Sequence, residues 1–473
     1  MVVGSMARGC EHVVIGAGPG GYLAALRLAQ QGRDVLLVDT RGALGGVCLN
    51  EGCIPSKALI HAANLASEAR HAAAMGIEIG DVRVDLPKLV SWKDSVVKRL
   101  TGGVRTLTDK AGVAHMVGRA RFVSDSELDV EGESATQRVT FDSAIVATGT
   151  RPIELADLPF DGERVIGSRE ALSPSSLPER LAVVGAGYIG LELGLVYAKL
   201  GVQVEIVDVV PALLPDLDPM VGKLMTRVLR DLGVNLHLES RAVGYHGEAL
   251  ALQRLGAADD DARQLVPCDR VLVCVGRRPL TDNLGLDVAG VELDPSGHIK
   301  VDEQQRTSAE NIYAIGDVVD GPPLAHKAYR EAEVAAASIV APGSAAFDNQ
   351  VIPAVIYTDP EIAWVGLDER TARARGYEVL TGRFPLRVSG RAMTLGAEQG
   401  FIKAVANAAD ERLLGVTIVA PNASELIGEA TLAIEMGAFL DDVADTIHAH
   451  PTLSEGLQEA MHLCLGKGVH VAS

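Results

Sequence analysis

A single pattern of apolar and glycine-rich segments occurs twice in the chain. In the first copy, the apolar run 13–15 predicts a buried strand, and the glycine-rich segment 16–21 predicts a tight turn into a helix over 22–31. A second apolar run, 35–38, predicts the next strand, which ends at Asp39. This order of strand, turn, helix and strand is typical of a doubly wound parallel sheet.

The second copy has the same order of segments. The run 181–184 predicts a strand, 185–190 the glycine-rich turn, 191–200 the helix, and 204–207 the second strand, which ends at Asp208. In both copies the aspartate follows the first glycine by 23 positions. One such turn is weak evidence of a nucleotide site, but two copies with the same flanking strand, helix and acid predict two dinucleotide sites.

Each position in this pattern has a physical role. The first glycine permits the tight turn, the second lets a pyrophosphate approach the backbone, and the third lets the helix pack on the strand. The helix N-terminus then faces the phosphates, and the aspartate can accept hydrogen bonds from ribose hydroxyls. The alternative is that the glycines only make tight turns. The glycines concerned are Gly16, Gly18, Gly21, Gly185, Gly187 and Gly190.

The rest of the chain predicts further domains. With 473 residues the chain exceeds the size of a single hydrophobic core. Outside the two copies, helices are predicted over 55–73 and 86–110, a strand pair within 114–140, and buried strands over 271–275 and 311–317. From residue 347 a separate C-terminal α+β domain is predicted, with strands near 355–357, 401–405 and 414–419 and helices near 425–435 and 457–463.

Composition and charge restrict the class of protein. Hydrophobic residues make up 48% of the chain, which also has 50 glycines, as expected of a well-packed α/β protein. The formal net charge of −19 argues against nucleic acid as a general partner, because phosphate binding requires basic patches. No run reaches the roughly 20 apolar residues of a membrane span, and residues 1–11 lack the apolar core of a signal peptide. The cytoplasm is therefore the expected compartment.

The six cysteines form neither a disulfide framework nor a zinc pattern, but two of them are close in sequence. Cys48 and Cys53 follow the first glycine-rich turn and can close a small disulfide loop. A helix that starts near Pro55 would direct the positive end of its dipole at a thiolate and stabilise it. A structural disulfide is the alternative, although cytosolic disulfides are usually catalytic or redox-sensing. The other cysteines, interpreted as buried apolar residues or surface thiols, are Cys10, Cys268, Cys274 and Cys464.

Three motifs together carry a family resemblance. They are the cysteine segment 45–57, the pair Gly316 and Asp317 at the end of a buried strand, and the segment 450–455, His-Pro-Thr-Leu-Ser-Glu. With the two dinucleotide patterns, they make residues 11–466 resemble the flavoprotein disulfide reductases, and most closely those of the dihydrolipoamide dehydrogenase type. The resemblance implies an α/β fold with two Rossmann-like dinucleotide-binding domains, for FAD and NAD, and a C-terminal α+β dimerisation domain.

The resemblance also implies domain boundaries and cofactor contacts. Four domains are expected. Residues 1–151 would bind FAD and carry the redox disulfide, and residues 152–278 would bind NAD. Residues 279–346 would complete the FAD site, and residues 347–473 would form the dimer interface. Residues expected at FAD are Gly16, Gly18, Gly21, Asp39, Lys57, Thr148, Gly149, Gly316, Asp317 and Ala325. Residues expected at NAD are Gly185, Gly187, Tyr188, Gly190, Asp208 and Gly276, with Tyr188 as a gate over the flavin. The family usually has Glu at the position of Asp39.

Charge near the second site favours NAD over NADP. A site for the 2′-phosphate of NADP needs cations at the end of the second-copy strand. Here Asp208 is followed by two valines and a proline, and the next Lys or Arg is Lys223. An aspartate that faces a phosphate would repel it, so we expect NAD.

The resemblance assigns the redox chemistry to the cysteine segment. Cys48 would exchange with the substrate thiol, and Cys53 would lie against the flavin. Lys57 would lie beside the flavin ring, and Glu192 would be its ion-pair partner. The flavin performs the difficult electronic step, so the protein would supply orientation and electrostatics.

Proton transfer is assigned to the C-terminal motif. His450 would take the substrate thiol proton and return it, and Glu455 would fix its tautomer. His448 is nearby, but the family motif favours His450. In the family this pair faces the disulfide of the other subunit, so a homodimer is expected.

The implied activity is oxidation of protein-bound dihydrolipoamide to lipoamide with reduction of NAD+ to NADH, in a 2-oxo acid dehydrogenase complex. We expect the lipoyl group on an acyltransferase subunit of that complex. The alternatives are an NAD(P)H-dependent disulfide reductase of the glutathione or mercuric reductase type and a non-catalytic assembly subunit. The glutathione reductases carry basic residues after the second-copy strand, and mercuric reductases usually end in a cysteine pair, whereas Cys464 stands alone here.

Overall fold

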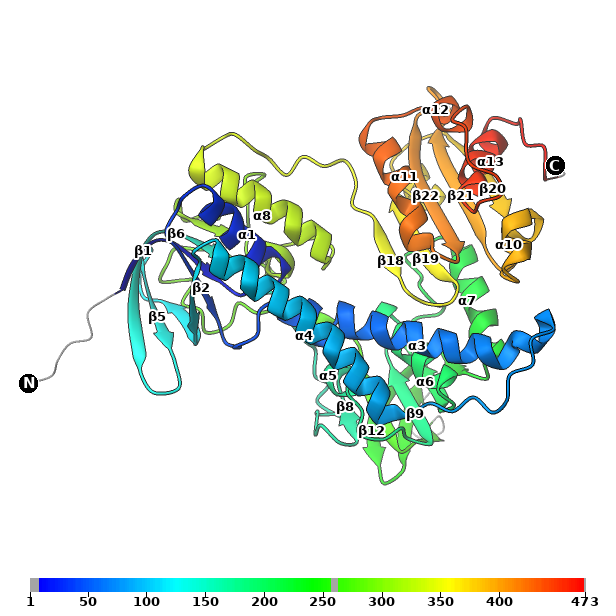
Figure 1. Cartoon of the computed structure of the whole chain (residues 1–473), viewed down its shortest axis with the longest axis horizontal. Helices are drawn as coiled ribbons and strands as arrows, with labels where there is room; N and C mark the ends of the chain where they lie inside the picture. The colour runs from blue at the N-terminus through cyan, green and yellow to red at the C-terminus, as the bar shows by residue number, and fades with distance from the viewer. Residues whose placement is uncertain (1–7, 257–262, 472–473) are drawn as a thin grey trace, which may run out of the picture. The chain divides into compact units, whose positions relative to one another are not determined.

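The computed structural model describes residues 8–256 and 263–471, which fall into two compact units. Figure 1 follows the chain through both units by colour. Each unit is built from segments that are distant in sequence. The first unit comprises Met1–Leu59, Asp85–Ile153 and Gly276–Asp348, and the second comprises Ile60–Val84, Glu154–Val275 and Asn349–Ser473.

The first unit is built on a seven-stranded sheet. The path runs β3-β2-β1-β6-β5-β4, and β17 pairs with β6 beside it. Its strands are β1 (Arg8–Ile15), β2 (Val35–Asp39), β3 (Ala114–Val117), β4 (Arg119–Phe122), β5 (Glu127–Glu131), β6 (Thr136–Val146) and β17 (Ile312–Ala314). A separate antiparallel ribbon joins β7 (Thr150–Pro152) to β16 (Arg277–Pro279). The helical elements are α1 (Pro19–Gln30), α2 (Gly46–Glu51), the first turns of α3 (Cys53–His71), α4 (Leu86–Lys110), η2 (Gly316–Val318) and α8 (Ala325–Val340).

The central strands of this sheet are parallel and buried on both faces. Along β1, Val13 belongs to one core cluster and Val14 to the other, as the two-residue period of a strand requires. The cluster of Val14 includes apolar residues of α1 and α8, whereas the cluster of Val13 includes Phe122 and Leu128 from the antiparallel strands. Helices therefore cover one face of the parallel strands, and the ends of β1, β6 and β17 form a common edge.

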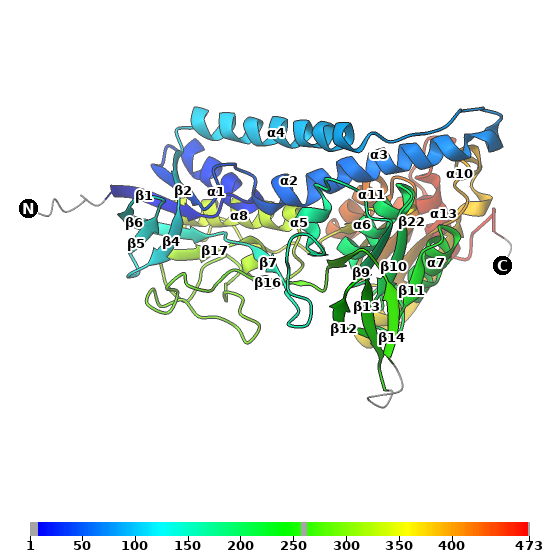
Figure 2. The same cartoon turned by 90° about the horizontal axis from the view of Figure 1, so that it is seen from below.

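The second unit begins with a parallel sheet that corresponds to the second sequence copy. Its order is β11-β10-β9-β15-β8. A three-stranded antiparallel sheet, β12-β13-β14, follows β11 in the chain (Figure 2). The elements are η1 (Ala72–Met75), β8 (Val165–Ile166), α5 (Ser168–Ala171), β9 (Arg180–Val184), α6 (Tyr188–Lys199), β10 (Gln203–Val207), α7 (Pro219–Asp231), β11 (Asn235–His237), β12 (Ser240–His246), β13 (Ala249–Arg254), β14 (Arg263–Pro267) and β15 (Arg270–Val273).

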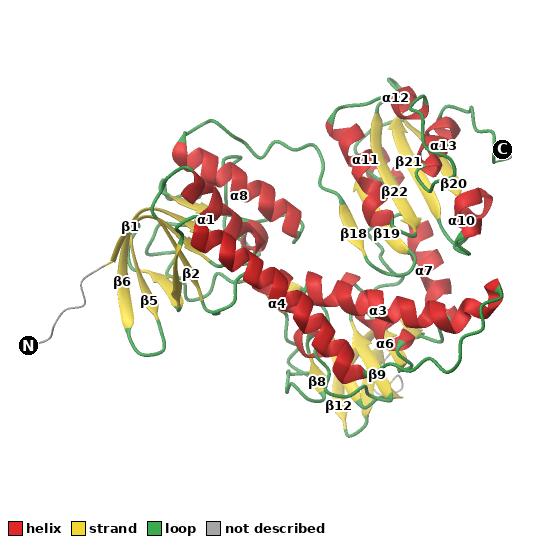
Figure 3. Ribbon diagram, in the orientation of Figure 1, coloured by secondary structure: helices red, strands yellow, loops and turns green. Residues whose placement is uncertain are grey.

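The C-terminal part of the second unit contains an antiparallel sheet of order β18-β19-β22-β21-β20. Figure 3 shows these strands together with α11 and α13. Ile427 of α11 and Leu457 of α13 share one core with Ile402 and Ile418 of the sheet. The elements are β18 (Ala354–Ile356), β19 (Glu361–Gly366), α9 (Glu369–Ala374), β20 (Val379–Pro385), η3 (Leu386–Val388), α10 (Gly390–Thr394), β21 (Phe401–Asn407), β22 (Leu413–Ala420), α11 (Ala423–Glu435), α12 (Leu440–Ala444) and α13 (Glu455–Cys464).

The predicted α/β fold class is confirmed, and so are the two strand–turn–helix–strand copies. Five helices begin two or three residues earlier than predicted. Those expected from residues 22, 55, 191, 425 and 457 start at Pro19, Cys53, Tyr188, Ala423 and Glu455. The sheet β12-β13-β14 was not predicted. The four-domain division is finer than the two compact units and stays a prediction, and residues 1–7 of the expected N-terminal segment lie outside the described residues.

Of the helices within residues 8–256 and 263–471, none combines the length and the apolar character that crossing a membrane would require.

Candidate active site

The two glycine-rich turns have nearly the same backbone geometry. Gly16 and Gly185 have φ angles of +104° and +105°, which favour glycine. A β-carbon on Gly16 would lie 2.3 Å from the carbonyl oxygen of Ala147, and one on Gly185 would lie 2.4 Å from that of Cys274. In each copy, therefore, the first glycine lets its turn approach the end of the neighbouring strand.

The other two glycines of each turn differ in what surrounds them. A β-carbon on Gly21 would lie 1.8 Å from the oxygen of Gly16, so this position needs glycine for the helix to pack on the turn. Gly190 has the same relation, at 1.9 Å, to the first glycine of its own turn. By contrast, a β-carbon on Gly18 or Gly187 would meet no atom within 4 Å. Both of these are N-caps, of α1 and α6, so each turn presents open space at a helix N-terminus, where a pyrophosphate fits.

The two terminal aspartates hold these turns in place. Asp39 accepts hydrogen bonds from the amides of Ala17, at 2.7 Å, and Arg41, at 2.7 Å. Asp208 accepts one from the amide of Ala186 at 2.6 Å and another from the next turn. This bracing of the turn was not predicted from the sequence. Because each carboxylate oxygen has two lone pairs, both aspartates keep capacity for a ribose hydroxyl.

The edge of the first sheet gathers the other residues expected at FAD. Gly16 follows β1, Thr148 and Gly149 follow β6, and Gly316 follows β17, and these three parallel strands are neighbours. Ligands of doubly wound sheets bind at the carboxyl ends of such strands. The hydroxyl of Thr148 donates to the carbonyl oxygen of Leu280 at 2.8 Å, which ties this edge to the segment after β16.

Asp317 lies in a hydrogen-bonded network that sequence analysis did not predict. Arg277 donates from Nε to the hydroxyl of Thr150 at 2.8 Å, and that hydroxyl donates to Asp317 at 3.1 Å. Burial raises the pKa of Asp317, while Thr150 and the charges of Arg277 and Lys327 oppose that rise. Neither Arg277 nor Thr150 was predicted as a site residue, because their contact depends on the pairing of β7 with β16.

A buried ion pair on α8 supports the Gly316 turn. Nζ of Lys327 lies 2.6 Å from Oε1 of Glu331, and the two side chains are only 4% and 3% exposed. The second oxygen of Glu331 accepts the amide of Gly316 at 2.7 Å. Ala325, expected at FAD, is the first residue of α8. The ion pair therefore fixes the turn that carries Asp317.

The cysteine segment is attached directly to the first glycine-rich turn. The amide of Gly45 donates to the carbonyl oxygen of Ala17 at 2.8 Å. A β-carbon on Gly46 would lie 2.6 Å from Cα of Gly18. Helix α2 starts at Gly46 and carries Cys48 in its first turn. The structure thus places the redox-candidate segment against the N-cap of α1.

Cys48 and Cys53 are neighbouring thiols. Cys53 is the first residue of α3, where the helix dipole favours a thiolate. The hydrogen bond with Cys53 raises the pKa of Cys48, burial and the charge of Cys53 raise it further, and Lys57 opposes the rise. Lys57 stands one turn after Cys53 on α3 and therefore belongs to the same charged cluster.

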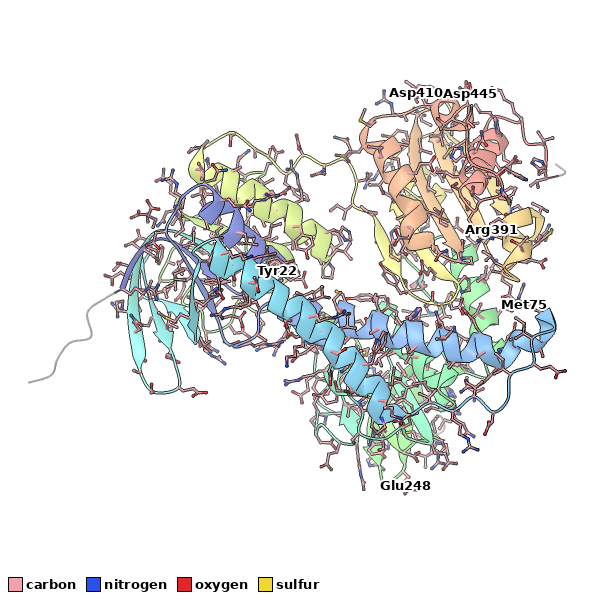
Figure 4. The ribbon with its side chains drawn as sticks, in the orientation of Figure 1. Tyr22, Met75, Glu248, Arg391, Asp410 and Asp445 are labelled. Carbon is pink, nitrogen blue, oxygen red and sulfur yellow. The ribbon has the colours of Figure 1, made fainter. Side chains whose placement is uncertain are left out.

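Two tyrosines lie close to this pair. The hydroxyls of Tyr22, labelled on α1 in Figure 4, and Tyr329 of α8 are 2.8 Å apart, and the rings meet edge to face. Burial raises the pKa of Tyr22, and a charge on Cys48 raises it further. Burial also raises the pKa of Tyr329, with contributions from Tyr22 and both cysteines. Neither tyrosine was predicted as a site residue, since single aromatic residues in a helix carry no specific signal.

Of the residues expected at NAD, most lie around the second turn in the second unit. Tyr188 is the first residue of α6 and is exposed. Glu192, one turn later, is buried and accepts the amide of Tyr357 at 2.9 Å. The predicted pairing of Glu192 with Lys57 stays a prediction. Gly276 has a φ of +121° and accepts the amide of Ile153 at 3.0 Å within the first unit.

The predicted histidine–carboxylate pair is present in the second unit. Nδ1 of His450 lies 2.7 Å from Oε1 of Glu455, and the His450 side chain is 80% exposed. The other carboxylate oxygen accepts the amide of Thr452 at 2.7 Å. Although burial alone would raise it, the amide of Thr452 and the ring and charge of His450 lower the pKa of Glu455. A carboxylate only accepts, so Nδ1 donates, which leaves Nε2 as the ring nitrogen that can take a proton.

Two profiles of known protein families match most of the chain. The profile of the pyridine nucleotide-disulphide oxidoreductases matches residues 10–332, and the profile of their dimerisation domain matches residues 352–461. The chain belongs to the pyridine nucleotide-disulphide oxidoreductase family. The two glycine-rich turns and the cysteine pair lie within the first matched range, and the histidine–carboxylate pair lies within the second. The dimerisation domain supports a homodimer.

Curated relatives match over almost the full length. The dihydrolipoyl dehydrogenase 2 of Haloarcula marismortui is 46% identical over 474 residues, 99% of this chain and 100% of the relative. The dihydrolipoyl dehydrogenase of Geobacillus stearothermophilus is 44% identical over 471 residues, 100% of this chain and 99% of the relative. That of Bacillus subtilis is 43% identical over 476 residues, 100% of both.

Solved structures agree in fold. LpdA from Mycobacterium tuberculosis superposes with a TM-score of 0.87 at 28% identity, covering 96% of this chain and 99% of that one. The HOCl-induced flavoprotein disulfide reductase RclA from Escherichia coli gives a TM-score of 0.84 at 25% identity, covering 96% and 99%. The expected family and fold class are therefore confirmed.

Proposed function

We propose that this chain is a dihydrolipoyl dehydrogenase, which oxidises protein-bound dihydrolipoamide to lipoamide and reduces NAD+ to NADH. The observation that carries this proposal is the attachment of the Cys48 segment to the first dinucleotide turn, through Gly45 on Ala17 and Gly46 on Gly18. This contact supports a dithiol pair that works next to a dinucleotide cofactor. Relatives at 43–46% identity over the full chain carry the name of this activity.

The cofactors are FAD in the first unit and NAD in the second. The open space beside Gly18 and Gly187, each at a helix N-terminus, suits a pyrophosphate in both units. Bound FAD would carry two electrons from the reduced cysteine pair to NAD+. Asp208, and the lack of any Lys or Arg between it and Lys223, favour NAD over NADP.

The cysteine pair exchanges with the substrate dithiol. In its oxidised form the pair is a disulfide. A substrate thiolate attacks Sγ of Cys48, the Cys48–Cys53 bond breaks, and Cys53 leaves as a thiolate at the N-terminus of α3. The second substrate thiol then displaces Cys48, which releases lipoamide and leaves both cysteines reduced. Two electrons have moved from the substrate to the pair, and Lys57 stabilises the negative charge.

His450 supplies the base for this exchange. Its Nδ1–H is held by Glu455, so Nε2 can take the proton of the substrate thiol and later release it. The lowered pKa of Glu455 keeps this partner ionised throughout the neutral range. We propose that His450 serves the cysteine pair of the other subunit in a homodimer.

The physiological partner would be the lipoyl-bearing acyltransferase subunit of a 2-oxo acid dehydrogenase complex, in the cytoplasm. A net charge of −19 suits a basic docking domain on that subunit.

Steady-state turnover with dihydrolipoamide tests the activity. We expect NADH formation with NAD+ and at least about 10-fold less product with NADP+, because a like charge near the 2′-phosphate costs more than one tenfold step in affinity. Glutathione disulfide reduction by NADPH in place of this reaction would contradict the proposal.

Mixed dimers test the shared site. Neither Cys48→Ser nor His450→Ala should turn over dihydrolipoamide alone. Coexpression should restore about a quarter of wild-type activity, since half of randomly assembled dimers are mixed and each has one intact site. No restoration in mixed dimers that have been verified by mass would place each site within one chain.

A further inference from the structure

The segment between α12 and α13 carries a second histidine in a different environment. His448 has a side chain that is 5% exposed, whereas that of His450, two positions later, is 80% exposed. Figure 4 labels Asp445, near the start of this segment. Nε2 of His448 lies 2.7 Å from Oε1 of Glu429 on α11, and its Nδ1 lies 2.8 Å from the carbonyl oxygen of Thr446.

Both partners of this ring are acceptors. A carbonyl oxygen cannot donate a hydrogen bond, and neither can an ionised carboxylate. The two contacts of His448 are therefore both satisfied only when both ring nitrogens carry hydrogen. In that form, the contact between the buried ring and the half-exposed Glu429 is a charge-assisted hydrogen bond.

The same hydrogen bonds fix the course of the segment. The carbonyl oxygen of Thr446 also accepts Nε2 of Gln458 on α13, at 2.9 Å, and Gln458 bonds the carbonyl oxygen of Ala444 at 2.8 Å. His448 thus joins the middle of the segment to α11, while Gln458 joins its beginning to α13. His450 follows directly after this anchored point.

Two carboxylates on the packed elements interact with His448. They are Glu429 on α11 and Glu455 on α13, and Glu455 also bonds His450. On α12, Asp441 pairs with Lys467, and Asp442 accepts the amide of Phe439. The charge of His448 adds to the contacts that lower the pKa of Glu455, after the amide of Thr452 and the ring of His450.

We propose that His448, held by Glu429, is a positioning residue for the His450–Glu455 pair. The contact of the buried His448 ring with the half-exposed Glu429 anchors the segment that presents His450 and balances the charge next to it. This inference rests on the proposed function, because it assigns a task to His448 only if His450 handles the thiol proton.

Two single substitutions separate the charge effect from loss of structure. Glu429→Gln keeps an amide oxygen that accepts Nε2–H but removes the negative charge. The uncompensated His448 cation would then disfavour a proton on His450, so the acid limb of the kcat profile for dihydrolipoamide oxidation should move to lower pH. His448→Gln keeps a donor for Glu429 but leaves its charge unbalanced, so the acid limb should move to higher pH. Each shift should be roughly half a pH unit, as for one charge in a half-exposed site.

Three comparisons complete the test. The double variant H448Q/E429Q should return the acid limb to near the wild-type position, since the pair is removed as a unit. NADH-dependent ferricyanide reduction, which needs no thiol proton transfer, should stay within about 2-fold of wild type in all variants. His470→Gln, which breaks an exposed pair with Glu459 at 2.7 Å, should leave the profile unchanged.

The outcomes are distinguishable. Shifts of opposite sign support the inference, and if H448Q does not fold, a shift of E429Q to lower pH supports it alone. An unchanged profile in E429Q, or shifts of the same sign in both variants, would overturn it. If the wild-type enzyme fails to oxidise dihydrolipoamide while it still reduces ferricyanide, the proposed function itself fails and the inference with it.

Discussion

The open space beside Gly187 predicts that a substitution there should weaken NAD binding without affecting folding. Gly187 is the N-cap of α6, with φ −73° and ψ −177°, a conformation that alanine adopts without strain. A β-carbon there would meet no protein atom within 4 Å. Gly187→Ala should therefore fold normally and place a methyl group where the NAD pyrophosphate would approach.

The magnitude follows from what the methyl group displaces. Alanine is a poorer N-cap than glycine, but it also reduces the entropy of the unfolded chain, so the net effect on the free energy of unfolding should be below about 1 kcal/mol. A pyrophosphate held away from the α6 N-terminus loses one charge-assisted hydrogen bond, about 1.5–3 kcal/mol. The KM for NAD+ should rise about 10- to 150-fold.

The assay separates the two half-reactions. Reduction of the bound flavin by dihydrolipoamide, without NAD+, should proceed at the wild-type rate, and the melting temperature should change by less than about 4 °C. The control is Gly190→Ala, whose β-carbon would lie 1.9 Å from the oxygen of Gly185, so it should destabilise the fold as well. Wild-type KM in a folded Gly187→Ala protein would refute the placement of the pyrophosphate at this turn.

Three further substitutions change a redox cysteine or a charged side chain. Cys53→Ser should abolish dihydrolipoamide turnover but retain bound flavin, measured by its absorption; wild-type turnover would contradict its role. Glu331→Ala leaves Lys327 buried without its carboxylate and should lower the free energy of unfolding by about 3–5 kcal/mol in urea titrations, with loss of flavin; an unchanged midpoint would contradict the importance of this pair. Glu455 has a lowered pKa, so it stabilises the folded state above its ordinary value of 4.5, and this stability is lost as pH falls through the lowered value. Wild type should therefore exceed Glu455→Gln in stability at pH 7 and match it in strong acid; a difference that persists in strong acid would contradict this sign.

The glycine-rich turns could be predicted from the sequence because their requirements are local. A positive φ at Gly16 and the contact of Gly21 with its own turn leave no choice of residue, so the pattern of residue types reports the geometry directly. The spacing to Asp39 could be predicted for the same reason, since it is set by one helix and one strand. The structure added that the aspartate also braces its turn through the amide of Ala17.

The buried charges could not be predicted in this way. Lys327 and Glu331 have the spacing of an ordinary surface ion pair on a helix, and only the fold shows that both are buried against the Gly316 turn. His448 was set aside in favour of His450, because residue type alone does not reveal which histidine is anchored and which is exposed. The start of α3 at Cys53, two residues before the proline from which the helix was predicted, also could not be read from the local sequence.

The relay from dithiol to flavin to NAD is tested most directly by anaerobic stopped-flow reduction of the purified protein with dihydrolipoamide, followed by addition of NAD+ or NADP+. The account predicts a long-wavelength absorption band from a thiolate close to the oxidised flavin, followed by rapid NADH formation and little NADPH. Flavin that dihydrolipoamide does not reduce, but that NADPH reduces with subsequent transfer to a glutathione-type disulfide, would contradict both the substrate and the cofactor assigned to this site.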